Sequence, residues 1–181
     1  RHTWMRTVTR STLLERFHLA QKPVRVGSRL FRHRGVKDGL PQFTANGPLN
    51  RPMVYYPAGP SGDFDNDGRL DLFLINWYRG NHSRLLRNVS PPRHWLQVRV
   101  RGRRMNRMGI GAKVTVRIPK GSLLGFQEIT TGYGYASGQP AIAHFGLGGE
   151  KAVTVTVEFP DGKRITRTKV AADQRIVIEE K

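Results

Sequence analysis

From Trp95 to the C-terminus, apolar and polar residues alternate one by one, which is the period of a strand with one buried face. The apolar members of the three clearest stretches are Leu96, Val98 and Val100, then Val114, Val116 and Ile118, then Val153, Val155, Val157 and Phe159. Ile176 and Ile178 indicate a final strand. Because Gly or Pro residues separate these stretches and no helical period occurs among them, the pattern predicts an antiparallel β-sandwich or barrel.

The first third of the chain has a weaker pattern. Residues 24–60 are rich in Gly and Pro and hold only short apolar pieces, which predicts short strands joined by long loops. Residues 1–25 are basic. Within them Thr12 and Glu15 have capping-box spacing, so we expect a short helix around residues 12–20 that ends at Pro23.

Composition excludes several classes of function. The chain has no cysteine, so disulfides, thiolate metal sites and cysteine nucleophiles are excluded. No apolar run approaches the roughly 18–20 residues that cross a bilayer, so no transmembrane segment is predicted. Lys and Arg number 31 against 13 Asp and Glu, a net charge of +18. This excess either keeps the chain soluble or attracts an acidic protein partner, an acidic glycan or another polyanion.

Residues 62–72 carry the most informative chemistry. An aspartate stands at positions 1, 3, 5 and 9 of a loop whose position 6 is glycine: Asp63, Asp65, Asp67, Asp71 and Gly68. Ca²⁺ prefers six to eight oxygen ligands, and alternate carboxylates on a curling backbone can converge on it. The backbone carbonyl of Arg69 is expected to supply the oxygen of position 7. The spacing therefore predicts a structural Ca²⁺ site.

Two alternatives to calcium stay open. Mg²⁺ requires a smaller and stricter octahedron, which disfavours it. A solvated acidic turn is disfavoured because four of the 13 acidic residues lie within nine positions of a basic chain. Position 12 is Leu74 rather than Glu, and a strand-like run follows the loop, so the loop is not a helix–loop–helix EF-hand.

Two further groups of residues are candidates for ligand contact. The best polyanion site is a run of arginines that begins on the outward face of a strand: Arg99, Arg101, Arg103, Arg104 and Arg107. It is otherwise a solvated basic face. No zinc finger, helix-turn-helix or RNA-recognition motif accompanies it, so nucleic acid is disfavoured. Tyr133 and Tyr135 alternate with glycines and either stack on a glycan or cover a sheet edge.

The sequence does not predict an enzyme. His144 lies between Ala143 and Phe145 in an expected strand and is interpreted as a structural histidine. Ser137, His144 and Asp161 could be written as a triad, but no nucleophile-elbow sequence supports it. The Gly-rich runs lack the lysine of a P-loop and the strand–helix context of a dinucleotide site.

The acidic segment resembles a known repeat. Residues 62–74 are similar to the calcium loop of FG-GAP/VCBS repeats, the blades of integrin-type β-propellers. Residues 28–32 and 83–88 resemble the strand that such repeats carry beside the loop. The resemblance implies a partial propeller-like blade over residues 26–92. A single blade needs neighbours to cover its faces and edges, so we expect the rest of a propeller or other subunits beside it.

The C-terminal region resembles the ASPIC/UnbV domain. The similar stretches are residues 94–102, 106–114, 132–137, 143–148 and 157–162. FG-GAP repeats followed by this domain are the arrangement of the cartilage acidic protein family and its bacterial relatives. The resemblance implies three regions: a basic segment (1–25), the blade (26–92) and an ASPIC/UnbV-like β domain (93–181). It also implies an exported β module, extracellular or periplasmic, but no mechanism. The acid cluster, the single blade and the distributed positive charge predict that this module is non-catalytic and serves in interaction or assembly.

Overall fold

The computed structural model describes residues 5–6, 29–48, 58–76, 82–135 and 137–181. Within these ranges every regular element is a β-strand, which confirms the all-β fold class. The helix predicted around residues 12–20 lies outside the described residues. The strands are β1 (Met5–Arg6), β2 (Arg29–Lys37), β3 (Leu40–Pro48), β4 (Ser61–Gly62), β5 (Asp71–Leu74), β6 (Arg84–Leu86), β7 (His94–Arg101), β8 (Lys113–Arg117), β9 (Leu123–Glu128), β10 (Ala143–Gly148), β11 (Ala152–Glu158), β12 (Arg164–Ala171) and β13 (Gln174–Glu179).

The chain divides into two compact units. One contains Arg1–Gly59 and Leu74–Arg84, and the other contains Pro60–Phe73 and Leu85–Lys181. In the first unit β2 and β3 form an antiparallel hairpin, with β1 beside β2. The hairpin turns at Asp38 and Gly39, whose φ angles of 53° and 75° fit a two-residue turn with both residues in the left-handed region.

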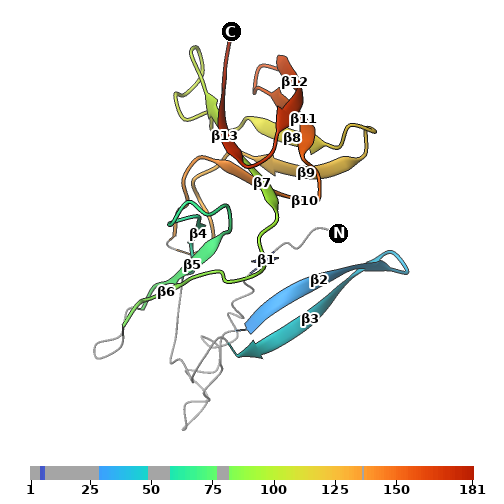
Figure 1. Ribbon diagram of the computed structural model, residues 1–181. Helices are drawn as coiled ribbons and strands as arrows, with labels where there is room; N and C mark the ends of the chain where they lie inside the picture. The colour runs from blue at the N-terminus through green and yellow to red at the C-terminus, as the bar shows by residue number, and fades with distance from the viewer. Residues whose placement is uncertain (1–4, 7–28, 49–57, 77–81, 136) are drawn as a thin grey trace. The chain divides into compact units, whose positions relative to one another are not determined.

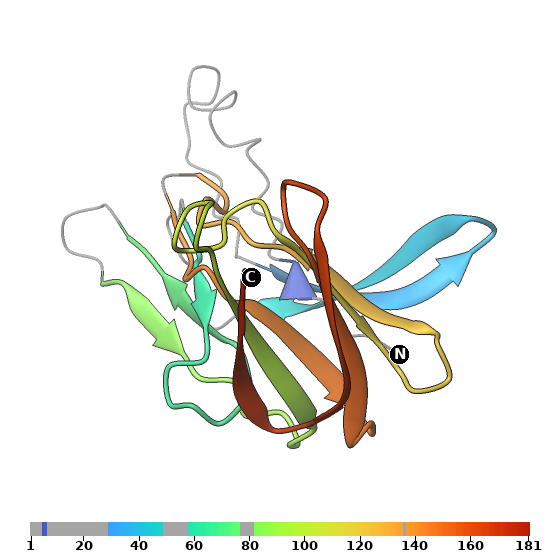
Figure 2. The ribbon, with the colours of Figure 1, turned by 90° about the horizontal axis from the view of Figure 1, so that it is seen from above.

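The second unit contains a two-layer sandwich (Figures 1 and 2). One sheet has the order β10-β7-β13 and the other the order β12-β11-β8-β9. The two sheets bury a common core made by the alternating apolar residues, which confirms the four predicted strand stretches: Leu96, Val98, Val100, Val114, Val116, Phe145, Leu147, Val153, Val155, Val157 and Ile178. Strand β13 pairs with β7 in parallel, from Gln174 opposite Leu96 to Glu179 opposite Arg101, so this sheet is mixed rather than purely antiparallel.

The two layers approach closely where β9 faces β10. A Cβ atom on Gly125 would lie 2.7 Å from Cδ1 of Phe145, so glycine is required for this contact. The side chain of Gln127 joins the same two strands: its amide donates to the backbone carbonyl of His144 at 2.7 Å and accepts from the His144 N–H at 2.9 Å. These two bonds replace a strand ladder at that edge.

A third small sheet, of order β4-β5-β6, positions the acidic loop. Ser61 pairs with Leu72 and Gly62 with Asp71, so residues 63–70 are the connection of an antiparallel hairpin. The loop belongs to the same compact unit as the sandwich. The sequence-based boundary at residues 92 and 93 stays a prediction. Among the described residues no helix has the length and apolar character that a membrane crossing requires.

Candidate metal site

The backbone of the acidic loop curls so that its N–H groups face its own carboxylates. The N–H of Gly68 donates to Oδ2 of Asp63 at 3.2 Å, and that of Arg69 donates to Oδ1 of Asp67 at 2.9 Å. Asn66 and Gly68 have φ angles of 62° and 84°, which provide the sharp turns. These bonds tie the carboxylates of Asp63 and Asp67 to the backbone of the loop.

Three of the four predicted aspartates come together. One carboxylate oxygen from each of Asp63, Asp65 and Asp71 lies within 4.8 Å of the others, an arrangement that could hold a metal ion. The Asp63 side chain is only 1% exposed and the Asp65 side chain 22%. Like charges this close repel one another, and the repulsion grows with burial, so the cluster needs positive charge nearby.

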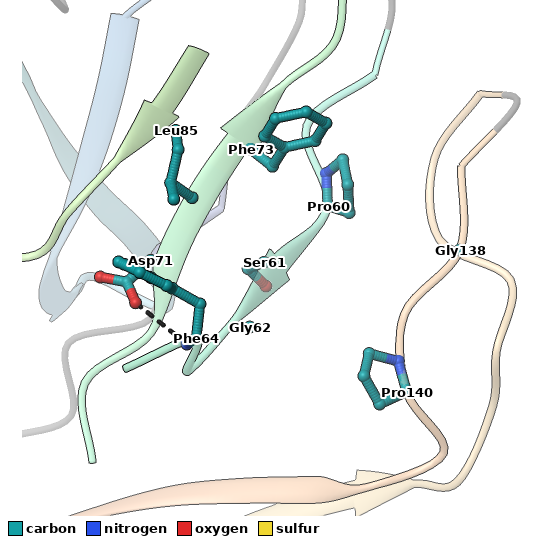
Figure 3. A pocket seen from close by; sticks show the side chains of 9 residues that line it. All are labelled: Pro60, Ser61, Gly62, Phe64, Asp71, Phe73, Leu85, Gly138 and Pro140. Atoms are coloured by element: carbon teal, nitrogen blue, oxygen red, sulfur yellow. Dashed lines mark hydrogen bonds between the residues drawn. The ribbon is translucent and has the colours of Figure 1, made fainter. Parts of the chain in front are cut away.

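Asp71 is held by backbone groups from two segments. Its Oδ2 accepts from the N–H of Phe64 at 3.2 Å, the bond drawn in Figure 3, and its Oδ1 accepts from the N–H of Asn88 at 2.7 Å. The Asn88 side chain also donates to the backbone carbonyl of Leu70 at 3.2 Å. Asn88 was not predicted as a site residue, although it ends the second strand motif that resembles the repeat.

Asp63 is held from the sandwich side. Its Oδ2 accepts from Nε2 of Gln97 at 3.0 Å and lies 3.5 Å from the guanidinium of Arg175. Its Oδ1 is buried and has no hydrogen-bond partner among the described residues. A buried carboxylate oxygen without a donor is costly. Because Asp65 and Asp71 lie next to it, a hard cation such as Ca²⁺ fits this donor set.

Asp67 has different neighbours. Its carboxylate pairs with the guanidinium of Arg69 and lies 3.6 Å from that of Arg87. Partial burial raises the pKa of Asp67, but the N–H, charge and side chain of Arg69, with a bond to Asp65, outweigh it and lower the pKa below its usual value. The roles predicted for Asp67 and for the Arg69 carbonyl as ligands stay predictions.

Three arginines supply positive charge around the loop. Arg69 contacts Asp67, Arg87 contacts Asp65 with Nε to Oδ2 at 2.8 Å, and Arg175 contacts Asp63. Arg87 and Arg175 were not singled out by sequence reasoning, because their proximity to the loop depends on tertiary structure. Their charges partly offset those of the carboxylates, so the surroundings of the loop are less negatively charged than its sequence indicates.

The loop lies on an aromatic and amide platform on the outer face of the β10-β7-β13 sheet. The ring of Trp95 covers Gly68 so closely that a Cβ there would come within 2.1 Å of it. Trp95 stacks on His144, with ring centroids 6.2 Å apart and planes 3° apart. Nδ1 of His144 is 3.3 Å from Nε2 of Gln97.

The surroundings of His144 favour its neutral form, because its pKa is lowered below the usual value. Burial lowers its pKa, and the charge of Arg175 lowers it further, while the charge of Asp63 and a backbone bond with Gly68 act in the opposite direction. A neutral imidazole can accept the Gln97 amide hydrogen on Nδ1. These contacts support the interpretation of His144 as a structural histidine.

A shallow apolar hollow of about 180 Å³ lies beside the loop (Figure 3). Its lining includes Phe64, Phe73 and Leu85, which are 52%, 44% and 49% exposed. Pro140 faces them from the other side of the hollow. The hairpin that carries the acidic loop therefore presents an apolar surface as well as a charged one.

Glu179 pairs with some arginines of the predicted cluster and not with others. Arg101 and Arg103 lie 2.7 Å and 3.6 Å from that carboxylate. The side chains of Arg99, Arg104 and Arg107 are exposed and form no ion pair with the described residues.

The backbone of the arginine loop is fixed by the neighbouring Glu180. This carboxylate is 4% exposed, and its Oε2 accepts the N–H groups of Arg103, Arg104 and Met105 at 2.7, 2.8 and 3.2 Å. These bonds lower the pKa of Glu180, against smaller opposing effects of burial and Asp161.

The predicted aromatic pair lies in a small closed loop. A bridge between Gly132 and Gly138 closes it, and Tyr133 and Tyr135 are 37% and 66% exposed. Their role in glycan contact stays a prediction.

Comparison with known proteins places this site in context. Residues 102–181 match the family described as ASPIC and UnbV. Cartilage acidic protein 1 of Mus musculus is 33% identical over 163 residues, covering 84% of this chain and 24% of that protein. The human protein of the same name is 34% identical, with 84% and 23% covered. The chain thus spans about a quarter of the length of these relatives. Residues 102–181 are an ASPIC/UnbV domain, and the chain is a distant homologue of cartilage acidic protein 1.

Proposed function

We propose that the acidic loop binds Ca²⁺ and that the ion secures the loop to the sandwich, giving a non-catalytic module for interaction or assembly. The observation that carries this proposal is Oδ1 of Asp63, which is buried without a partner among the described residues, in a carboxylate that lies beside Asp65 and Asp71. Asp63, Asp65 and Asp71 would hold the ion, with Asp67 and the Arg69 carbonyl as further ligands. Bound Ca²⁺ would add the positive charge that the three arginines supply only in part.

The proposed module is exported. The three arginines near the carboxylates oppose a further cation, so we expect weak binding of the kind found in extracellular modules, with dissociation constants of roughly 10⁻⁴–10⁻³ M.

The exposed apolar residues Phe64, Phe73 and Leu85 beside the loop support contact with another protein surface. The partner itself is expected to be acidic, given the net charge of +18.

Thermal unfolding of the full chain tests the metal proposal. The melting temperature is measured after EDTA treatment and again with Ca²⁺ or Mg²⁺ at millimolar concentrations. A ligand that binds only the folded state raises the melting temperature. We expect a rise with Ca²⁺ that exceeds the rise with Mg²⁺ and reverses on chelation. Identical unfolding curves with EDTA and with Ca²⁺ would refute the proposal.

A second candidate function is binding of acidic glycans. It is favoured by Arg99, Arg104 and Arg107, whose exposed side chains lack ion pairs with the described residues, and by the fixed backbone of the loop that carries Arg104. Binding to a sulfated polysaccharide, weakening as salt rises, is the expected behaviour. The triple variant R99Q/R104Q/R107Q should lose it, whereas R164Q, at an arginine paired with Glu158, should retain it. Equal binding by both variants would count against this surface.

A further inference from the structure

Gln97 is a buried amide on the outer face of β7, at a position where strand alternation predicts exposure. It is 6% exposed because the acidic loop covers it. Its neighbours on the same face, Arg99 and Arg101, are exposed. A buried amide needs hydrogen-bond partners, and the partners of this one are Oδ2 of Asp63 at 3.0 Å and Nδ1 of His144 at 3.3 Å.

The position of Gln97 relative to the proposed ligands has a direct chemical consequence. Its amide uses Oδ2 of Asp63, on which the Gly68 N–H also converges at 3.2 Å. The other oxygen, Oδ1, is buried and has no donor among the described residues, and the Asp63 carboxylate belongs to the cluster with Asp65 and Asp71. An outer residue that orients a ligating carboxylate commonly tunes metal affinity by roughly 10–100-fold.

We propose that Gln97 is a positioning residue for the metal site, through which the sandwich orients Asp63 toward the ion. This inference rests on the proposed Ca²⁺ binding. The site is therefore shared between the loop and strand β7, and occupancy by metal and docking of the loop on the sandwich are thermodynamically coupled. His144 completes the arrangement by accepting from the same amide and stacking on Trp95.

The test is calorimetric titration of Ca²⁺ into the EDTA-treated and desalted full chain and its variants. In Gln97→Leu the amide is replaced by an apolar side chain of similar size, so Asp63 loses its orienting donor. We expect the dissociation constant for Ca²⁺ to rise by at least about 10-fold. The Ca²⁺-induced gain in melting temperature should shrink in parallel.

Gln127→Leu is the matched control. Gln127 is also a partly buried glutamine on the sandwich, and it also bonds to His144, but through the backbone of that residue rather than toward the loop. This variant should lower the melting temperature in EDTA and leave the Ca²⁺ dissociation constant within about two-fold of the wild-type value. A merely structural role of Gln97 would give the same result for both variants.

Gln97→Asn covers the case in which Gln97→Leu does not fold. The shorter side chain keeps an amide but withdraws it from Asp63, so weaker Ca²⁺ binding is again expected. If the wild-type chain binds Ca²⁺ and every Gln97 variant that folds binds it as tightly as the wild type, the positioning role is wrong while the metal site stands. If the wild-type chain shows no binding, the proposed function itself fails, and the inference fails with it.

Discussion

Strand β7 lies between two loops that are each held by a buried carboxylate, and the two carboxylates differ in one respect. Near its start, Asp63 anchors the acidic loop; beyond its end, Glu180 anchors the arginine loop. Glu180 receives three backbone N–H groups on one oxygen. The side chain of Asp63 is only 1% exposed, and its Oδ1 is itself buried without any donor among the described residues. The contrast is between a carboxylate that backbone N–H groups hold in place and one that keeps a buried oxygen without a described partner, for which we proposed a cation.

The surrounding charges explain the difference. The arginine loop contains basic side chains and free N–H groups, so one carboxylate stabilises it without help. The acidic loop places four aspartates within nine residues, and its own N–H groups are shared among them. Three arginines offset part of the repulsion but do not reach Oδ1 of Asp63.

The largest expected effect comes from neutralising each carboxylate in turn. Asp63→Asn removes a ligand charge, so Ca²⁺ affinity should fall by more than the roughly 10–100-fold expected for an outer partner. Glu180→Gln should leave Ca²⁺ affinity unchanged, because Glu180 bonds the other loop. Calorimetric titration of both variants checks this. Equal losses in the two would erase the distinction between the loops.

Docking of the acidic loop can be broken at Gly68. Its φ of +84° is unfavourable for any residue with a side chain, and a Cβ at this position would lie 2.1 Å from the Trp95 ring. Gly68→Ala should therefore lower the melting temperature by several degrees and change the near-ultraviolet circular dichroism of Trp95. Gly162→Ala has the same φ of +84° but open space around it, so it measures the backbone strain alone. Matching melting temperatures for the two variants would show that the contact with Trp95 contributes nothing.

The pH dependence of stability tests the role of Glu180 in the arginine loop. The pKa of Glu180 is held below 4.5 in the folded chain, mainly by the N–H groups of residues 103–105. Its contribution is therefore present above the unfolded pKa and is lost as pH falls through the folded value. In EDTA, Glu180→Gln should be less stable than wild type near neutral pH, and the difference should shrink as the pH falls below the unfolded pKa of about 4.3. A constant difference in melting temperature across that range would contradict this account.

The sequence predicted the local parts of this molecule well. Alternating apolar residues located the strands of the sandwich, and the aspartate spacing located the cluster of Asp63, Asp65 and Asp71. Both signals are short in range: a strand period is two residues, and the loop positions follow one another along the chain. The parallel pairing of β13 with β7 was not predicted, because it joins segments almost 80 residues apart and leaves no local pattern.

The same reason explains the site residues that were missed. Gln97 and Arg175 looked like ordinary outward-facing strand residues, and only the docked loop converts them into partners of Asp63. Asn88 belonged to a recognised strand motif, but its bond to Asp71 spans 17 positions. A polar residue on the outward face of an alternating strand is the one sequence signal that could have marked such positions. That signal does not distinguish Gln97, which bonds to the loop, from Arg99, which is exposed.

The smallest expected effect is that of Asp67, at position 5 of the loop, for which the sequence and the geometry indicate different importance as a ligand. Spacing alone makes Asp67 a ligand equal to Asp63. In the structure its carboxylate is paired with Arg69 and lies near Arg87, apart from the three converging oxygens. Asp67→Asn should therefore weaken Ca²⁺ binding by less than Asp63→Asn, because Asp67 lies outside the three-carboxylate cluster and its charge is already offset by arginines. If calorimetric titration gives equal losses for the two variants, Ca²⁺ displaces the arginines and recruits Asp67, and the ligand set is the full one that the spacing predicts.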